Sequence, residues 1–437
     1  MLYAVAQGVE VLDFDTSLPG SPLLIAVRER YLQVGGLSKE LVIFLKEEPS
    51  GISDIEAHLR AGGGDACTEG KLHQALSRLM DLAVLEGHEN PEGEQSKIQN
   101  KRSYAPSYFI LKFPVLPEKM LRPLTSRLAP LFDPRCVRWI LPTMLLTQLL
   151  LWLYLIKGLL GLAASLRGYD YAILLVGNYL GLVLHELGHA SACNFCRVRH
   201  GPIGFGIYLI FPAFYTDVTA AWRLPRFQRI LVDAGGIYMN LLAATVLLLA
   251  YDITHRPVFI VLAGLYDVVV WVSLWPFVRM DGYWLISDLL GIPNLMNANR
   301  ELTNWLIGRV WRRKDPAPPI LSVEPGWARS IYFLYYTLFL VSALAMAFGL
   351  SRWYLPRVAR SVPRLVCAIV AQIRATGLSM ELVRPLGSLV MTMVPLFALS
   401  RYLLRGARFL LRQLKGVSSW FFQWLTYQRT SPSSGGR

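Results

Sequence analysis

One apolar stretch, from about Tyr171 to Phe195, most constrains the fold, because it is long enough to cross a lipid bilayer as a helix. Within it, the segment GLVLHELGHA carries His185, Glu186 and His189. Residues four apart share one face of a helix, so the two imidazoles can bind the same metal ion. A glutamate beside the first histidine stands where a metal-bound water needs a base. Ionisable groups are costly at membrane depth unless they face a partner, a metal or water, so a zinc site is favoured over a chance match.

The composition indicates a polytopic membrane protein. Of the 437 residues, 54% are hydrophobic and 17% are charged. The formal net charge of +14 is compatible with nucleic-acid binding, but the basic residues lie beside apolar runs rather than among stacking aromatics. Membrane topology therefore explains the charge better, and no nucleic-acid partner is expected. The five cysteines are odd in number and scattered, which argues against a disulfide framework.

Six apolar segments approach the roughly 20 residues that a helix needs to cross a bilayer. They are residues 139–163, 171–195, 230–251, 258–277, 331–350 and 383–404. Arginines before the first segment place the N-terminus in the cytoplasm, and basic clusters after the second, fourth and sixth segments then fall on that side. Five arginines between 352 and 374 oppose this order, so residues 365–380 are predicted to be an interfacial or re-entrant helix, or an additional crossing. The expected location is the inner (cytoplasmic) membrane, in multi-pass form.

Residues 1–95 have the pattern of a small cytosolic α+β domain. Leu23–Val34 alternates as a hairpin does, and helices are predicted from Leu37, Ile52 and Thr68. Strands with three short helices suit a winged-helix-like module, with a generic three-helix domain as the alternative. The third helix carries too few basic residues to favour DNA binding.

Three further regions follow. Residues 96–136 form a linker and an interfacial segment, which includes the extended apolar run Tyr108–Pro117; residues 137–404 form the membrane domain. Residues 405–437 form a basic amphipathic tail that is predicted to bind anionic lipid. Ile203–Phe214 is too short to cross a bilayer. It is either a hairpin or strand near the site, whose edge could pair with an extended substrate, or a buried packing segment.

A catalytic zinc ion usually has three protein ligands, so one is needed beyond the two histidines. The acidic candidates are Asp217, Asp233, Asp252, Asp267, Asp281 and Asp288. Asp281 is favoured because Pro276 ends the preceding helix and Gly282 lets the backbone turn. If the third and fourth spans run in opposite directions, Asp281 also returns to the depth of His189. Taken alone, Asp281 would be interpreted as a helix cap.

Cys193 and Cys196, with His200, form an incomplete metal pattern. A structural zinc site needs four ligands, so packing at a helix end is the favoured interpretation of the two cysteines.

Three separated motifs together resemble the site-2 protease family of intramembrane zinc metalloproteases. They are HELGH at 185–189, AGGIYMN at 234–240 and PFVRMDGY at 276–283, and the resemblance covers about residues 170–290. It implies that His185, His189 and Asp281 bind zinc, that Glu186 is the general base, and that Asn240 lies near the substrate or its scissile carbonyl. The chain departs from the family pattern at Gly235-Gly236, where Gly-Pro is usual, and at Ser273-Leu-Trp-Pro276, which lacks a common asparagine.

The N-terminal residues resemble PqqD-like peptide-recognition domains, through LSKELVIFL (37–45), GISDIEAHL (51–59) and LAVLEG (82–87). Joined to the Asp-Gly-Tyr-Trp form of the third motif, they resemble the peptide zinc metalloprotease subgroup. This resemblance implies a zinc endopeptidase in the membrane that cleaves a membrane-associated or leader-bearing, ribosomally made peptide. Lipid is an expected partner, and a peptide exporter or secretion adaptor is a candidate partner.

Two alternatives remain. The chain could be a non-proteolytic membrane component that keeps the metal site and escorts a modified peptide to an exporter. A regulatory protease that releases a transcription factor is less favoured, because no periplasmic sensing domain of the PDZ kind is recognisable.

Overall fold

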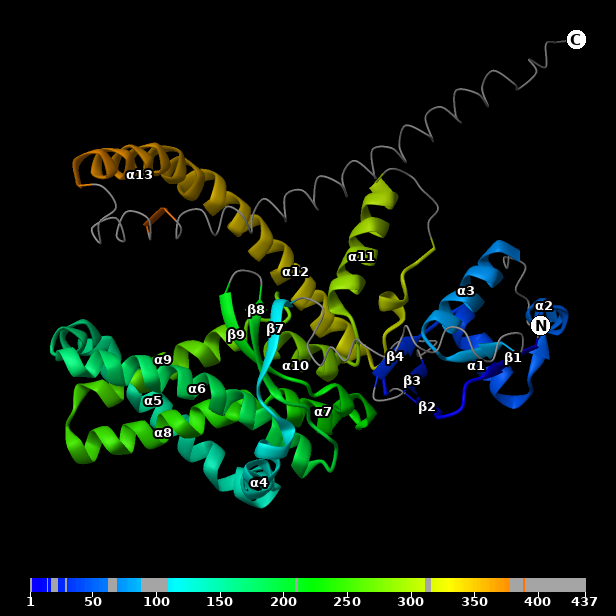
Figure 1. Cartoon of the computed structure of the whole chain (residues 1–437), viewed down its shortest axis with the longest axis horizontal. Coiled ribbons are helices and arrows are strands. Elements are labelled where there is room, and N and C mark those ends of the chain that lie inside the picture. The colour runs from blue at the N-terminus through cyan, green and yellow to red at the C-terminus, as the bar shows by residue number, and fades with distance from the viewer. Residues whose placement is uncertain are drawn as a thin grey trace, which may run out of the picture. The chain divides into compact units, whose positions relative to one another are not determined.

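A computed structural model shows a mainly helical chain with three small sheets (Figure 1). It describes residues 2–13, 15–16, 23–27, 30–61, 69–87, 109–208, 211–310, 316–376 and 388–389. The predicted tail at 405–437 and nearly all of the segment 383–404 lie outside these residues.

The N-terminal part contains two three-stranded sheets and three helices. Its elements are β1 (Leu2–Val5), β2 (Val9–Asp13), β3 (Leu23–Val27), β4 (Arg30–Val34), α1 (Leu37–Glu47), β5 (Ser50–Gly51), α2 (Ile52–Ala61), α3 (Glu69–Asp81) and β6 (Leu85–Gly87). The strand orders are β5-β1-β6 and β2-β3-β4. Leu23 lies opposite Val34 in an antiparallel pair, which confirms the predicted hairpin. Helices and strands enclose one apolar core that includes Ile25, Leu41, Leu45, Ile55, Leu72 and Leu76.

Within the part of the chain that the structure describes, four helices are long and apolar enough to cross a membrane. They are α5 (Pro134–Ala164), α6 (Gly168–Phe195), α8 (Gly235–Thr254) and α12 (Gly326–Gly349). Helix α12 continues through the π-helical turn η4 (Leu350–Tyr354) into α13 (Leu355–Thr376). The predicted segment at 258–277 is the apolar but shorter helix α9 (Pro257–Ser273). In the predicted segment 230–251, Ala234 separates α7 (Arg226–Asp233) from α8.

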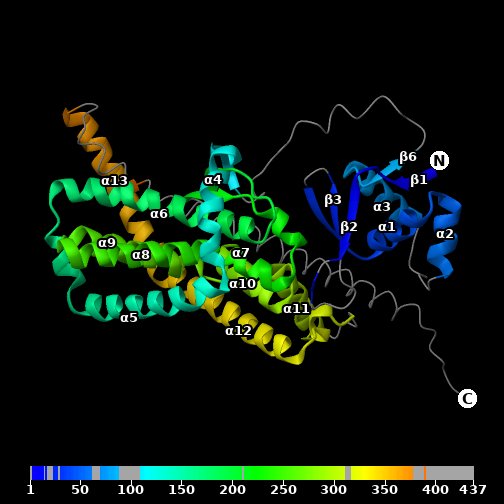
Figure 2. The same ribbon diagram turned by 90° about the horizontal axis from the view of Figure 1, so that it is seen from below.

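Helices α5, α6, α8 and α9 run alongside one another in both views (Figures 1 and 2). They share an apolar core that includes Leu151, Ala244, Ile260, Ala263 and Tyr266. Their outer faces are also apolar, with exposed side chains that include Leu146, Leu150, Leu175, Val176, Val246 and Val268. Helices that are hydrophobic on every side are typical of a membrane environment.

Local sequence sets the turn that joins α8 to α9. Helix α8 ends at Thr254 and is followed by His255, whose backbone is left-handed (φ 52°). Helix α9 begins with Pro257, which suits the first turn of a helix because no N–H is needed there. The remaining helices are α4 (Glu118–Leu128), α10 (Asp281–Leu290) and α11 (Leu295–Val310), with the short 3-10 helices η1 (Ala129–Phe132), η2 (Thr219–Arg223) and η3 (Pro319–Ser322).

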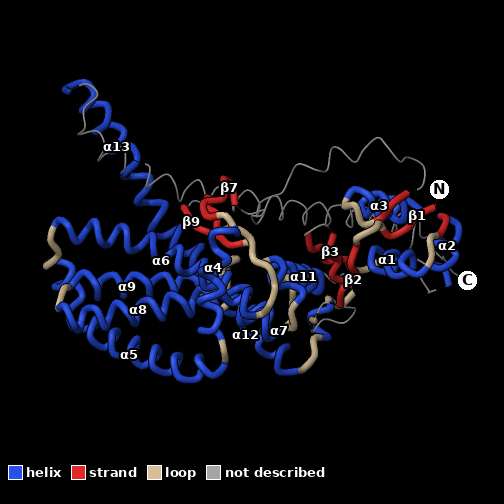
Figure 3. Tube along the Cα trace, turned by 60° about the horizontal axis from the view of Figure 1, so that its bottom comes forward, coloured by secondary structure: helices blue, strands red, loops and turns tan. Residues whose placement is uncertain are grey.

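A third sheet has the strand order β7-β8-β9, and Figure 3 shows its two outer strands, β7 and β9, in red. Its strands are β7 (Phe109–Leu116), β8 (Ile203–Tyr208) and β9 (Phe211–Thr216). The run Tyr108–Pro117, which was predicted to be extended, therefore contains a strand. Of the two interpretations of Ile203–Phe214, the structure shows the strand form, and β9 is at an edge of the sheet.

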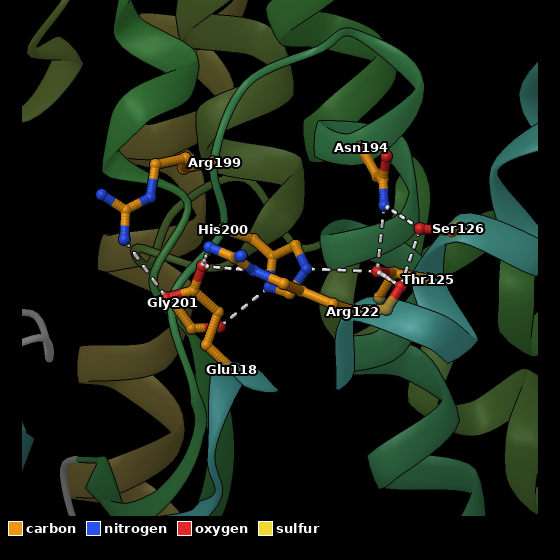
Figure 4. A network of polar contacts seen from close by, with 8 residues as sticks. All are labelled: Glu118, Arg122, Thr125, Ser126, Asn194, Arg199, His200 and Gly201. Atoms are coloured by element: carbon orange, nitrogen blue, oxygen red, sulfur yellow. Dashed lines mark hydrogen bonds and ion pairs between the residues drawn. The ribbon is translucent and has the colours of Figure 1, made fainter. Parts of the chain in front are cut away.

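A polar network fixes the amphipathic helix α4 to the segment that follows α6 (Figure 4). The buried Thr125 hydroxyl lies 3.2 Å from His200 Nε2 and accepts a hydrogen bond from the Asn194 amide at 3.2 Å. At the rim, Glu118 accepts hydrogen bonds from Arg122 and Arg199. The end of α6 is therefore held by side chains as well as by helix packing.

Candidate metal centre

The structure brings together the three side chains that the sequence suggested as metal ligands. His185 and His189 lie on the C-terminal half of α6, and Asp281 is the first residue of α10. One ligand atom from each lies within 4.8 Å of the other two. Both histidines are 7% exposed, so the group is almost enclosed by protein.

The separations between the ligand atoms suit a tetrahedral metal ion. The two Nε2 atoms of His185 and His189 are 3.3 Å apart. The carboxylate oxygens of Asp281 lie 2.9 Å from His185 Nε2 and 3.5 Å from His189 Nε2. Metal bonds of about 2.0–2.1 Å at tetrahedral angles place ligand atoms about 3.3 Å apart. The donor set and its spacing therefore fit zinc.

Contacts on the far side of each imidazole set its orientation. His189 Nδ1 lies 2.8 Å from the carbonyl oxygen of Val232, at the end of α7, so Nδ1 donates and Nε2 keeps its lone pair for a metal. His185 Nδ1 lies 3.1 Å from the side-chain amide of Asn240 on α8. The atom of Asn240 that faces the ring is Nδ2, which only donates; with a metal at His185 Nε2, Nδ1 would carry the proton, and the amide would have to turn over to present its oxygen.

Gly236 leaves the space that the two imidazole tips occupy. A Cβ at this position would lie 2.5 Å from both His185 Nε2 and His189 Nε2. Gly188 allows the helices themselves to meet, because a Cβ there would overlap the backbone carbonyl of Gly235. The two glycines therefore allow close contact with α6. Gly235 lies against the α6 backbone, and Gly236 lies against the Nε2 atoms of the two histidines.

Asp281 also has a buried carboxylate oxygen that suits a cation. Its Oδ2 atom is buried and has no hydrogen-bond partner among the described residues, although His185 Nε2 is near. Burial alone would raise the pKa of Asp281, but attraction to His189 and His185 outweighs burial and holds it below its ordinary value. The two oxygens of this carboxylate lie beside both Nε2 atoms, where they suit a metal ligand.

Glu186 is 9% exposed and directly follows His185 on α6. The Thr216 hydroxyl, at the end of β9, donates a hydrogen bond to the Glu186 backbone carbonyl at 3.2 Å. This contact places the edge strand β9 beside the candidate base.

The other acidic candidates do not join the three ligands. Asp267 faces Gln148 of α5, whose amide nitrogen can donate to both carboxylate oxygens at 2.7 and 2.8 Å. Asp217 accepts a hydrogen bond from the Thr219 hydroxyl at 2.5 Å. Asp288 is paired with Arg229 at 2.8 Å. Burial, together with repulsion from Asp288, raises the pKa of Asp233 well above its ordinary value.

The cysteine motif is not part of a metal group among the described residues. Cys193 and Cys196 pack in an apolar cluster with Val232 and Met239, and His200 contacts Thr125 and Gly201 instead.

Sequence reasoning missed the support of the site by α7. The Val232 carbonyl is a backbone group, so no side-chain pattern could mark it. The position of Asp288 could have suggested a supporting role, because it lies seven residues after Asp281 and therefore on the same face of α10. No pattern connected it with Arg229.

Comparison with known proteins points to the same class of site. A curated protein of Bacillus subtilis (strain 168), "Putative peptide zinc metalloprotease protein YydH", is 30% identical over 161 residues. The match covers 36% of this chain and 62% of that relative, so the chain spans less than two thirds of the relative's length. No family model and no solved structure matches the chain. The chain is thus related to a protein named as a zinc metalloprotease.

Proposed function

We propose that this protein is a membrane-embedded zinc metalloendopeptidase, similar to site-2 proteases. Its substrate would be a membrane-associated or leader-bearing peptide. The observation that carries the proposal is the convergence of His185, His189 and Asp281 within 4.8 Å. The relative named as a peptide zinc metalloprotease supports the same chemistry. The apolar surfaces of the long helices support a location in the membrane.

When bound, zinc would supply a Lewis acid and lower the pKa of a water molecule at its open position. Glu186 would accept a proton at its carboxylate and return it to the leaving amine. Asn240 and the Val232 carbonyl would keep the two imidazoles turned toward the ion. Asn240 is therefore proposed to act through His185, where the resemblance had implied a role beside the scissile carbonyl.

The substrate must present an extended segment, because a helical backbone keeps its carbonyls hydrogen-bonded. Edge strand β9 ends at Thr216, which contacts the backbone of Glu186. We expect an extended peptide to pair with β9 and so bring a peptide bond to the site. The N-terminal PqqD-like domain would hold the peptide's leader, and an exporter or secretion adaptor would receive the product.

Glu186→Gln tests the proposal, because it removes the base and leaves the three ligands. We expect hydrolysis of a quenched fluorescent peptide library by the full-length protein in detergent to fall by about 10²- to 10⁴-fold. Zinc content should remain at the wild-type level. Glu301→Gln, at an exposed position of α11, is the matched control and should keep full activity.

The alternative is a metal-binding component that escorts a modified peptide without cleaving it. It would be favoured if wild type and Glu186→Gln both bind zinc, neither hydrolyses peptides, and both support peptide maturation equally in cells. A wild-type protein that binds no zinc would contradict both functions.

A further inference from the structure

One guanidinium group joins three separate parts of the chain next to the candidate metal centre. Arg229 of α7 is 2% exposed. Its Nε donates to Asp288 Oδ1 of α10 at 2.8 Å, and its two terminal nitrogens donate to the backbone carbonyls of Leu224 and Asp15, each at 2.9 Å. Arginine suits such a position, because its planar fork holds several acceptors in fixed directions.

Both helices that Arg229 connects contribute to the metal centre. Val232, in the last turn of α7, orients His189 through its carbonyl, and α10 begins with Asp281. Asp288 lies two turns beyond Asp281 on the same helix. Because a short helix moves as a unit, a shift of α7 against α10 would also move the carboxylate ligand relative to His189.

The N-terminal segment contacts the outer ends of the same two helices. The Asp15 carboxylate accepts hydrogen bonds from the backbone N–H of Arg226, at the start of α7, and from its guanidinium, at 3.0 and 3.1 Å. It supplies the cap that Pro225 lacks. The Thr16 hydroxyl donates to the Gly291 carbonyl at 2.7 Å, where α10 ends.

We propose that Asp15, Thr16 and Arg229 form a clamp across α7 and α10 that positions His189 and Asp281, and thereby couples the N-terminal domain to metal affinity. This inference rests on the proposed function only in requiring that the three ligands bind a metal. Arg229 is a positioning residue, because it reaches the ion only through Asp288, α7 and α10. A buried ion pair adds little net stability but specifies one arrangement, as such a clamp requires.

The test is the zinc affinity of the full-length protein, measured by competition with a chromophoric chelator. Arg229→Met should weaken zinc binding by about 10- to 100-fold, the range typical for residues that orient ligands. Asp15→Ala removes the two hydrogen bonds to Arg226, and Thr16→Val removes the one to the Gly291 carbonyl, so each should weaken zinc binding by a smaller factor. The visible spectrum of the Co²⁺-substituted protein should change in Arg229→Met, since the ligand geometry is altered.

Arg256→Met is the matched control. Arg256 pairs with Asp170 at 2.8 Å, at the start of α6, away from the ligands. Losing this pair can lower thermal stability but should leave the zinc affinity and the Co²⁺ spectrum unchanged. In the double variant Arg229→Met/Asp15→Ala, the loss of zinc-binding free energy should be smaller than the sum of the losses in the two single variants, because both act through the same clamp.

The outcomes separate the two proposals. If wild type and His189→Ala bind zinc equally weakly, the proposed function fails. If wild type binds zinc at this site and the clamp variants bind it as tightly, the inference is overturned. If Arg229→Met does not fold, the zinc affinities of Asp15→Ala and Thr16→Val are the test. If both variants bind zinc as tightly as wild type, the proposed coupling is wrong.

Discussion

The two halves of α6 have the same secondary structure but opposite surroundings. In the first half, Tyr171, Leu175 and Val176 are each more than half exposed. In the second half, every residue from His185 to Cys193 is buried, and this half carries the two histidines and Glu186. The apolar half meets the outside of the protein, while the polar half is enclosed by α4, α7, α8 and α10.

This contrast reverses the arrangement of a water-soluble helix, in which the polar residues would face outward. It fits a helix whose first half contacts lipid and whose second half builds a site shielded by protein. The buried half is therefore sensitive to small changes in shape and charge, whereas the exposed half tolerates them. The following substitutions test this difference.

The largest effect is expected from removing a ligand in the buried half. His189→Ala should lower the zinc affinity of the full-length protein by more than about 100-fold, since even residues that merely orient a ligand contribute that much. Chelator competition would measure it. His73→Ala, at an exposed position of α3, is the control and should bind zinc as wild type does.

Glycine-to-alanine changes in the two halves of α6 compare packing directly. At Gly188 the new methyl group would overlap the Gly235 backbone, so we expect a loss of about 1–3 kcal/mol in stability and weaker zinc binding. At Gly177 it would lie 2.5 Å from a Leu262 methyl group, which can rotate away, so the change should cost less than about 1 kcal/mol. Thermal unfolding in detergent would measure both, and equal losses would refute the contrast.

A moderate effect is expected where α4 holds the end of the buried half. Thr125→Val removes a buried hydroxyl that contacts both His200 and Asn194, and should cost about 1–3 kcal/mol. Thr143→Val is the control, because that exposed hydroxyl bonds only to the Trp139 carbonyl within α5. Comparable unfolding temperatures for the two variants would contradict the role of the network.

The smallest effect is expected at the rim of that network. Burial would raise the pKa of Glu118, but Arg122 and Arg199 outweigh it and lower the pKa below its ordinary value. A lowered folded-state pKa stabilises the protein above the unfolded-state pKa, and this stabilisation is lost as the pH falls through the folded-state pKa. Glu118→Gln should therefore be less stable than wild type near neutral pH, by at most about 1 kcal/mol, because the pair is partly exposed. The difference should vanish in acid; a difference that persists there would contradict this origin.

Much of the helical framework could be predicted from the sequence. The apolar runs predicted α5, α6, α8, α9 and α12, and the alternation of apolar and polar residues predicted the β3–β4 hairpin. Both patterns can be recognised because they are local in the sequence. The helix count was less predictable: α9 is shorter than its predicted segment, and Ala234 divides α7 from α8 within another. Hydropathy averaged over a long window does not register where one helix ends and the next begins.

The candidate ligands were predictable for a similar reason. His185 and His189 are related by one helical turn, and Asp281 stood out between Pro276 and Gly282. The remaining support could not be predicted. The Val232 carbonyl, the contact of Asn240 with His185 and the clamp of Arg229 on Asp288 each join distant parts of the chain, and some involve backbone groups common to every residue.

By itself, the sequence determined which stretches become apolar helices and which residue types can bind a metal, because spacing along a helix follows from local geometry. Only the tertiary structure decided that α6 and α10 meet, that glycines at 188 and 236 let backbone and imidazoles approach, and that Asp281 alone among the acidic candidates joins the histidines. Packing between distant segments decides these points, since each depends on the shape of both partners at once.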